Sequence, residues 1–234
     1  MKEQCQQKFL ERGLYGYCGV GLWILPAFVN HSCCPNVRRL HIGDWLVIHA
    51  SRVLKAGEGL TFPYFDVLLP LNKLRELSMR WGFHCNCERC KFEEKEEEIR
   101  EMEVLGSVCG LGNGDLVIRL EEGMKEKVMG KKERGFLRSS FWVAYSGVYK
   151  SEKLMIRRLG RGIPAELVLA ESVMDAVGGD ERLLKSVFGS LKKDGGGCGS
   201  RWVETERMMK MGRGIYGKVG KKQGMRALFE QLNW

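Results

Sequence analysis

The sequence has no stretch of 18 or more consecutive apolar residues, the length that a membrane-spanning helix needs. The chain begins MKEQCQQKFLERG, without the apolar segment that marks a secretory signal peptide. These absences argue against a membrane partner and against secretion. We therefore expect an intracellular protein.

An excess of acidic residues is absent as well, because 38 Lys and Arg residues outnumber 29 Asp and Glu residues. The first hundred residues hold 14 basic and 12 acidic residues, so the positive charge concentrates in the rest of the chain. A basic region attracts acidic partners, nucleic acid included, without giving sequence specificity. We interpret this region as the solvated face of helices, and nucleic-acid binding stays an alternative that depends on charge alone.

Hydrophobic residues make up 44% of the 234 residues, which is enough for a core in one or two domains. In the first seventy residues, alternating apolar positions and turn signals predict short strands at 37–41, 44–52 and 60–65. Residues 41–44 should form a hairpin turn, and Pro63 should end the pairing of the last strand. The segment 30–36 is polar and contains Pro35, which predicts a loop.

Helical patterns dominate the remaining sequence. Asn72 is predicted to cap a short amphipathic helix over 73–81, which Gly82 ends. The apolar face of this helix comprises Leu74, Leu77 and Trp81. After a cysteine-rich loop, the charged residues 93–103 predict a solvated helix or linker, and the glycines of 105–115 predict a loop. Further helices are predicted at 137–159, 165–177, 181–191, 203–216 and 223–232.

Nine cysteines in a chain without a signal peptide indicate a reducing compartment, where disulfides do not persist. Three of them form a C-x-C-x-x-C pattern at Cys85, Cys87 and Cys90. Structural zinc takes four such ligands in a tetrahedron, so one more donor must come from another segment. Cys33 and Cys34 are the available donors, and we predict Cys33. His84 is an alternative donor, but it lies next to Cys85 and would point away from the ion. Four buried, reduced cysteines without a metal are the alternative interpretation of the whole cluster.

The segment 30–36 (NHSCCPN) is rich in hydrogen-bonding groups. Taken by itself, it could equally be a binding loop or a turn whose side chains form hydrogen bonds within the turn. It resembles the NHSCxPN motif of SET-domain methyltransferases. Residues 57–64 (GEGLTFPY) resemble the GEELTFxY motif of that family, and residues 85–90 (CNCERC) resemble its post-SET CxCxxC motif. The three occur in the family's order and spacing. The flanking residues are similar to the SET-and-MYND branch and, more closely, to plant SET proteins with tetratricopeptide repeats.

The resemblance implies an α+β fold. Residues 1–70 would be the carboxy-terminal half of a SET domain, with short twisted sheets and knot-like threading. Residues 71–92 would be a post-SET helix and zinc-binding loop, and residues 93–234 a basic helical region. The family's first glycine-rich cofactor motif, a MYND finger and tetratricopeptide repeats are not found, so we expect an amino-terminally incomplete domain.

The resemblance also implies site residues. Asn30 and His31 match residues that hold S-adenosyl-L-methionine by backbone and side-chain contacts, and Tyr64 matches the catalytic tyrosine at the methyl-transfer site. Phe83 matches an aromatic residue that packs on the adenine, and Phe62 a position that lines the lysine channel. For both phenylalanines, core packing is an equally good interpretation. The sequence departs from the family pattern at Gly59, where a second Glu is usual, and at Pro63, where Asp is usual.

The function that the resemblance implies is S-adenosylmethionine-dependent methylation of lysine in a protein substrate, histone or non-histone. The alternative is a non-catalytic, zinc-stabilised module that binds a protein partner through a partial SET fold. We expect a nuclear or cytoplasmic location and favour the nucleus. Because we expect the domain to be amino-terminally incomplete, we also expect this chain alone to be weakly active or inactive.

Overall fold

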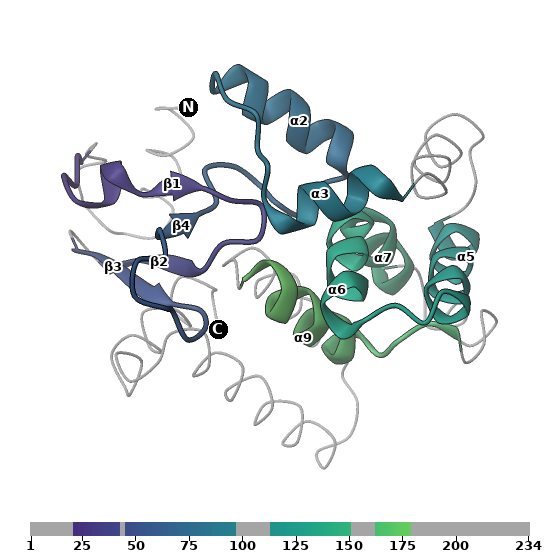
Figure 1. Ribbon diagram of the computed structural model, residues 1–234. Helices are drawn as coiled ribbons and strands as arrows, with labels where there is room; N and C mark the ends of the chain where they lie inside the picture. Colours follow the sequence, from purple (N-terminus) through teal and green to yellow (C-terminus); the bar gives the residue numbers. More distant parts are fainter. Residues whose placement is uncertain (1–20, 43–44, 97–112, 151–161, 179–234) are drawn as a thin grey trace, which may run out of the picture.

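The computed structural model describes residues 21–42, 45–96, 113–150 and 162–178. The part before residue 70 contains a short 3-10 helix, η1, and four short strands: η1 (Pro26–Phe28), β1 (Asn30–His31), β2 (Val37–Ile42), β3 (Trp45–Ala50) and β4 (Thr61–Phe62). The helices that follow are α2 (Leu71–Arg80), α3 (Glu88–Lys95), α5 (Asn113–Glu126), α6 (Lys131–Ser140), α7 (Trp142–Lys150) and α9 (Glu166–Val177). Strands and helices occupy opposite sides of the molecule, with α3 and α9 between them (Figure 1).

The strands form two small sheets. β2 and β3 pair antiparallel from Val37 opposite Ala50 to Ile42 opposite Trp45, which confirms the predicted hairpin. β1 and β4 pair in parallel, although β1 lies in the segment 30–36 that the sequence predicted as a loop. Two residues of that segment are therefore strand. β4 ends immediately before Pro63. This was expected, because proline has no backbone N–H to donate to the strand pairing.

Asn36 fastens the loop after β1 to the start of β4. Its side chain is 4% exposed, and its Nδ2 donates to the carbonyl of Gly59 at 2.9 Å and to Glu58 at 3.0 Å. Its Oδ1 accepts the backbone N–H of Thr61 at 2.8 Å. A buried carboxamide with all these bonds made holds two distant segments in register.

Replacing Asn36 with alanine is expected to lower the free energy of unfolding by about 1–3 kcal/mol. The reason is that the carbonyl of Gly59 and the backbone N–H of Thr61 lose their hydrogen-bond partners. Urea unfolding followed by circular dichroism measures the change. The matched control is Asn72→Ala on the exposed side of α2, for which we expect a change within about 0.5 kcal/mol. Equal effects of the two substitutions would contradict the role given to Asn36.

α2 differs from its prediction at both ends. Its N-cap residue is Pro70 in an extended conformation, so the helix begins before Asn72, and the prediction that Asn72 is the cap was wrong. Leu74 is buried as expected. The predicted apolar face includes Trp81, but in the structure Trp81 follows the helix and is 60% exposed. Gly82, with φ +77°, turns the chain away in a conformation that glycine adopts without strain.

The cysteine-rich segment is partly helical rather than a loop. Cys87 is the N-cap of α3, and Cys90 lies within that helix. The predicted division at residue 93 falls inside α3, and Glu93, from the stretch predicted as solvated, is buried. A cap at Cys87 allows helical spacing to carry Cys90 back toward the preceding loop.

The described part of the basic region is helical. The helix predicted over 165–177 is confirmed as α9. The helix predicted over 137–159 is instead two helices, α6 and α7, which are interrupted at Phe141; its last residues lie outside the described part. Residues 113–115, predicted as loop, begin α5, and the helix over 116–126 had not been predicted. The predicted helices at 181–191, 203–216 and 223–232 lie outside the described residues.

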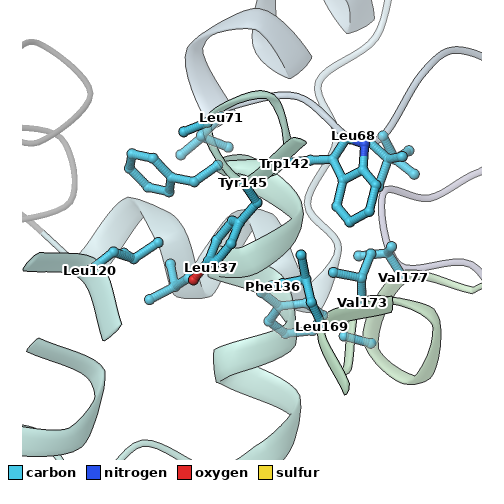
Figure 2. Close-up of a cluster of buried hydrophobic side chains, with 14 of the residues drawn as sticks. Leu68, Leu71, Leu120, Phe136, Leu137, Trp142, Tyr145, Leu169, Val173 and Val177 are labelled. Atoms are coloured by element: carbon cyan, nitrogen blue, oxygen red, sulfur yellow. The ribbon is translucent and has the colours of Figure 1, made fainter. Parts of the chain in front are cut away.

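The main hydrophobic core joins the cysteine-rich segment to these helices. Leu68 and Leu71 pack with side chains from α5, α6, α7 and α9, as Figure 2 shows for Leu120, Phe136, Tyr145 and Val173. α6 and α9 approach so closely that a Cβ on Gly135 would lie 2.4 Å from that of Ala176. Among the described residues, no helix has the length and apolar character needed to cross a membrane.

Candidate functional site: a cysteine cluster beside an aromatic cluster

Four cysteines from two segments bring their sulfurs together: Cys33, Cys85, Cys87 and Cys90. All four sulfurs lie within 4.8 Å of one another. The sulfur of Cys33 is 3.9 Å from that of Cys85 and 3.7 Å from that of Cys90. A zinc ion with Zn–S bonds of about 2.3 Å at the centre of a tetrahedron requires sulfur separations of about 3.8 Å. The donor set and its spacing therefore fit a zinc ion.

The protonation of the cluster also suits a metal. The pKa of Cys85 is lowered to about 4, first because Cys33 donates a hydrogen bond to it. The pKa of Cys87 is lowered as well, again first by Cys33, whereas the pKa of Cys33 is raised by its hydrogen bond to Cys85. The lowered pKa values of Cys85 and Cys87 favour the thiolate, the form in which cysteine binds metals. Cys34, the other donor that the sequence offered, lies outside the group of four.

Tyr64 follows β4 and stands among other aromatic side chains. Its hydroxyl donates a hydrogen bond to the carbonyl of Val29 at 2.9 Å. Ring centroids 5.1 to 6.0 Å away belong to His31, Phe62, Trp81 and Phe83. Three of these neighbours are predicted site residues. Trp81 was not predicted as one, and only its position next to the cysteine motif could have suggested it.

The remaining predicted residues differ in their surroundings. Asn30 is exposed and pairs with Thr61 through the β1–β4 ladder. Phe62 is 7% exposed and packs with Val29 and Val37 in a small core, so core packing describes its present contacts. Phe83 is half-buried between the aromatic cluster and the cysteine-rich segment. The structure thus brings the predicted aromatic residues together next to β1 and β4.

The side chain of His31 is fully engaged within the chain. Its Nδ1 accepts the backbone N–H of Tyr64 at 3.0 Å, and its Nε2 lies 3.3 Å from the sulfur of Cys33. Its ring stacks on that of Phe65 at 4.3 Å between centroids. Both ring nitrogens of His31 therefore face partners within the chain. The cofactor contacts predicted for His31 stay a prediction.

Arg89 is a buried neighbour of the cysteine cluster whose contacts the sequence did not reveal. It is 0% exposed, and its Nε pairs with Glu93 at 2.6 Å. Its guanidinium donates to the carbonyls of Val67 and Leu69 at 2.5 and 2.9 Å and to the hydroxyl of Ser140 at 2.7 Å. Burial raises the pKa of Glu93, although the charge of Arg89 opposes this. From the sequence, an arginine between two cysteines would be expected at the surface. In the structure, Arg89 instead connects α3 to α6 and to the chain after Tyr64.

Residues 4–65 of the chain match the family model described as SET domain. Its curated relatives include proteins named as methyltransferases. It is 37% identical over 82 residues to histone-lysine N-methyltransferase SMYD3 of Mus musculus, covering 35% of this chain and 19% of the relative. It is 39% identical over 79 residues to histone-lysine N-methyltransferase SET5 of Yarrowia lipolytica, covering 32% and 18%.

A third relative is the potential protein lysine methyltransferase SET6 of Saccharomyces cerevisiae, which is 39% identical over 77 residues, covering 31% of this chain and 21% of the relative. The chain therefore spans about a fifth of the length of the curated relatives it matches.

Proposed function

We propose that this chain is part of an S-adenosylmethionine-dependent protein-lysine N-methyltransferase. The observation that carries the proposal is the joining of Tyr64, His31 and the cysteine cluster in one network, next to the paired strands β1 and β4. We include in this proposal that the chain is related to the SET-and-MYND branch and to plant SET proteins. The proposal also includes the knot-like threading of the family. A histone substrate would place the protein in the nucleus, and a non-histone protein substrate would also suit the site.

Tyr64 is the catalytic residue in this proposal. Its hydroxyl donates a hydrogen bond to the carbonyl of Val29, so the lone pairs of the hydroxyl oxygen point elsewhere and can accept weak hydrogen bonds. They can orient the lysine amine and accept C–H contacts from the transferring methyl group. S-adenosyl-L-methionine supplies that methyl group. Holding the reacting groups in line can contribute about 7–11 kcal/mol to lowering the barrier.

The other residues have positioning roles. Asn30, which is exposed at the start of β1, and His31 would hold the cofactor by backbone and side-chain contacts. Phe83, with one ring edge toward Tyr64, would pack on the adenine. Phe62, behind Tyr64, would shape the wall of the lysine channel. Zinc, held by Cys33, Cys85, Cys87 and Cys90, would tie the cysteine-rich segment to the loop after β1.

Tyr64→Phe is expected to reduce methyl transfer about a hundredfold, because the reacting groups lose an oriented hydroxyl. Cofactor affinity should change little, whereas Asn30→Ala should weaken cofactor binding first. Radiolabelled methyl transfer onto histone and non-histone protein mixtures measures the first effect, and calorimetric titration with S-adenosylmethionine the second. Both are run on the 234-residue chain and on a longer form that supplies the front of the SET domain.

The same experiment separates this proposal from a non-catalytic interaction module. A longer form that binds the cofactor and labels no protein in any extract would contradict the enzyme function. A folded, zinc-loaded chain that binds no cofactor in either form would favour the interaction module.

A further inference from the structure

His31 lies between the two parts of the candidate site and bonds to both. The backbone N–H of Tyr64 donates to its Nδ1 at 3.0 Å, so Nδ1 carries no hydrogen. In a neutral imidazole the hydrogen is then on Nε2. Nε2 is 3.3 Å from the sulfur of Cys33, which is one of the four clustered cysteines. One ring therefore donates to a sulfur of the cluster and accepts from the backbone of Tyr64.

Neighbouring rings hold the imidazole in this orientation. It stacks on Phe65 with centroids 4.3 Å apart and planes inclined by 28°. Phe83 is 5.3 Å away on a tilted plane, and Tyr64 meets the ring edge-on at 5.4 Å. The backbone of His31 is fixed too, because it pairs with Phe62 in the β1–β4 ladder. A ring held in this way moves only when one of its two hydrogen-bond partners moves.

The sulfur contact is stronger when the cluster holds a metal. A metal-bound cysteine is a thiolate, and a hydrogen bond to an ionised acceptor is shorter and stronger than one to a neutral thiol. Groups that bond to metal ligands orient those ligands in turn. The position of Cys33 and the orientation of the His31 ring are therefore linked.

We propose that His31 is a positioning residue that sets the place of Tyr64 according to the geometry of the cysteine cluster. Its imidazole links the sulfur of Cys33 to the backbone N–H of Tyr64. An occupied cluster aligns the tyrosine, and a distorted or empty one releases it. The consequence for methyl transfer rests on the proposed function, but the link itself does not.

Three substitutions of His31 test its two hydrogen bonds separately. His31→Asn keeps an acceptor near the position of Nδ1 and removes the group that reaches Cys33. His31→Gln can reach Cys33 and leaves the N–H of Tyr64 without its acceptor. His31→Phe keeps a ring stacked on Phe65 and removes both bonds. Each is made in the 234-residue chain with isotope-labelled tyrosine, so that NMR reports the Tyr64 backbone amide.

The first measurement is amide exchange with water. The exchange of the Tyr64 amide should speed up about fivefold to tenfold in His31→Gln and His31→Phe, because its hydrogen bond is lost, and stay near the wild-type rate in His31→Asn. Equal exchange in all three variants would overturn the assignment of Nδ1 as the acceptor. Since His31→Asn and His31→Gln keep a polar side chain, a failure of His31→Phe to fold leaves the test intact.

The second measurement exchanges zinc for an NMR-active cadmium isotope, whose longer bonds to sulfur change the geometry of the cluster. In the wild type, the Tyr64 amide signal should shift on exchange, and a hydrogen-bond coupling should connect His31 Nε2–H to cadmium. Both effects should vanish in His31→Phe and His31→Asn. A wild-type-like shift in His31→Phe, or a chain that binds neither metal, would overturn the proposal. If the chain shows the coupling but neither it nor the longer form binds S-adenosylmethionine, the proposed function alone is contradicted.

Discussion

Replacing Cys90 with serine is expected to abolish zinc binding and to unfold the region around the cysteine cluster. Binding of a structural zinc ion contributes about 10–16 kcal/mol in small zinc domains, which equals or exceeds the net stability of about 5–15 kcal/mol typical of a whole domain. The sulfur of Cys90 is fully buried within the main core, so the damage should spread to the helices that pack there. Elemental analysis should find one zinc per wild-type chain and none in the variant.

Cys34→Ser is the matched control, because Cys34 is adjacent to a predicted ligand but lies outside the group of four. This variant should keep one zinc per chain and a melting temperature close to that of the wild type. A strong chelator should lower the melting temperature of the control and of the wild type equally. A Cys90→Ser protein that retains a full equivalent of zinc would show that the ligand assignment is wrong.

Arg89→Ala is expected to cost about 3–5 kcal/mol of unfolding free energy, because it leaves the buried carboxylate of Glu93 without its charge partner. The carbonyls of Val67 and Leu69 also lose a donor. The loss should loosen the packing of α6 on α3, since Ser140 bonds to both members of the ion pair. Urea unfolding with circular dichroism measures the change.

The control for this substitution is Arg80→Ala at the end of α2. Arg80 also pairs with a glutamate four residues away, but its side chain is 68% exposed. We expect a change below about 0.5 kcal/mol for such a surface pair. If the two arginine variants unfold at the same urea concentration, the buried network does not stabilise the core.

Features that repeat a local pattern could be predicted from the sequence. The hairpin of β2 and β3 has alternating strands around a turn, and α9 has apolar residues at helical spacing. The preference of zinc for four ligands predicts that Cys33 or Cys34 joins the three later cysteines, and the structure groups Cys33 with them. The meeting of His31 and Tyr64 follows from two motifs whose order and spacing resemble those of one family. In each case the signal lies in neighbouring residues or in a known combination of them.

Features that depend on distant partners could not be predicted. Arg89 looks like a surface residue until Glu93 and Ser140 surround it, because burial of a charge is decided by what packs over it. The capping of α3 by Cys87 breaks the usual preference for small polar caps. Glycines at 114, 123 and 135 weakened the helical pattern of α5 and α6, yet Gly135 is required where α9 crosses closely.

The parallel pairing of β1 with β4 constrains the order in which the chain folds. The partners lie about thirty residues apart, and joining them directly would mean closing a long, disordered loop. The β2–β3 hairpin lies inside that loop, and hairpins form in about 1–10 μs without distant contacts. Once it has formed, much less flexible chain remains to be ordered when β1 meets β4. We therefore expect the hairpin to fold first, the parallel pair second, and the two groups of cysteines to meet last. Substitutions that weaken the hairpin should accordingly slow the assembly of the whole site, although the hairpin contributes none of the four sulfurs.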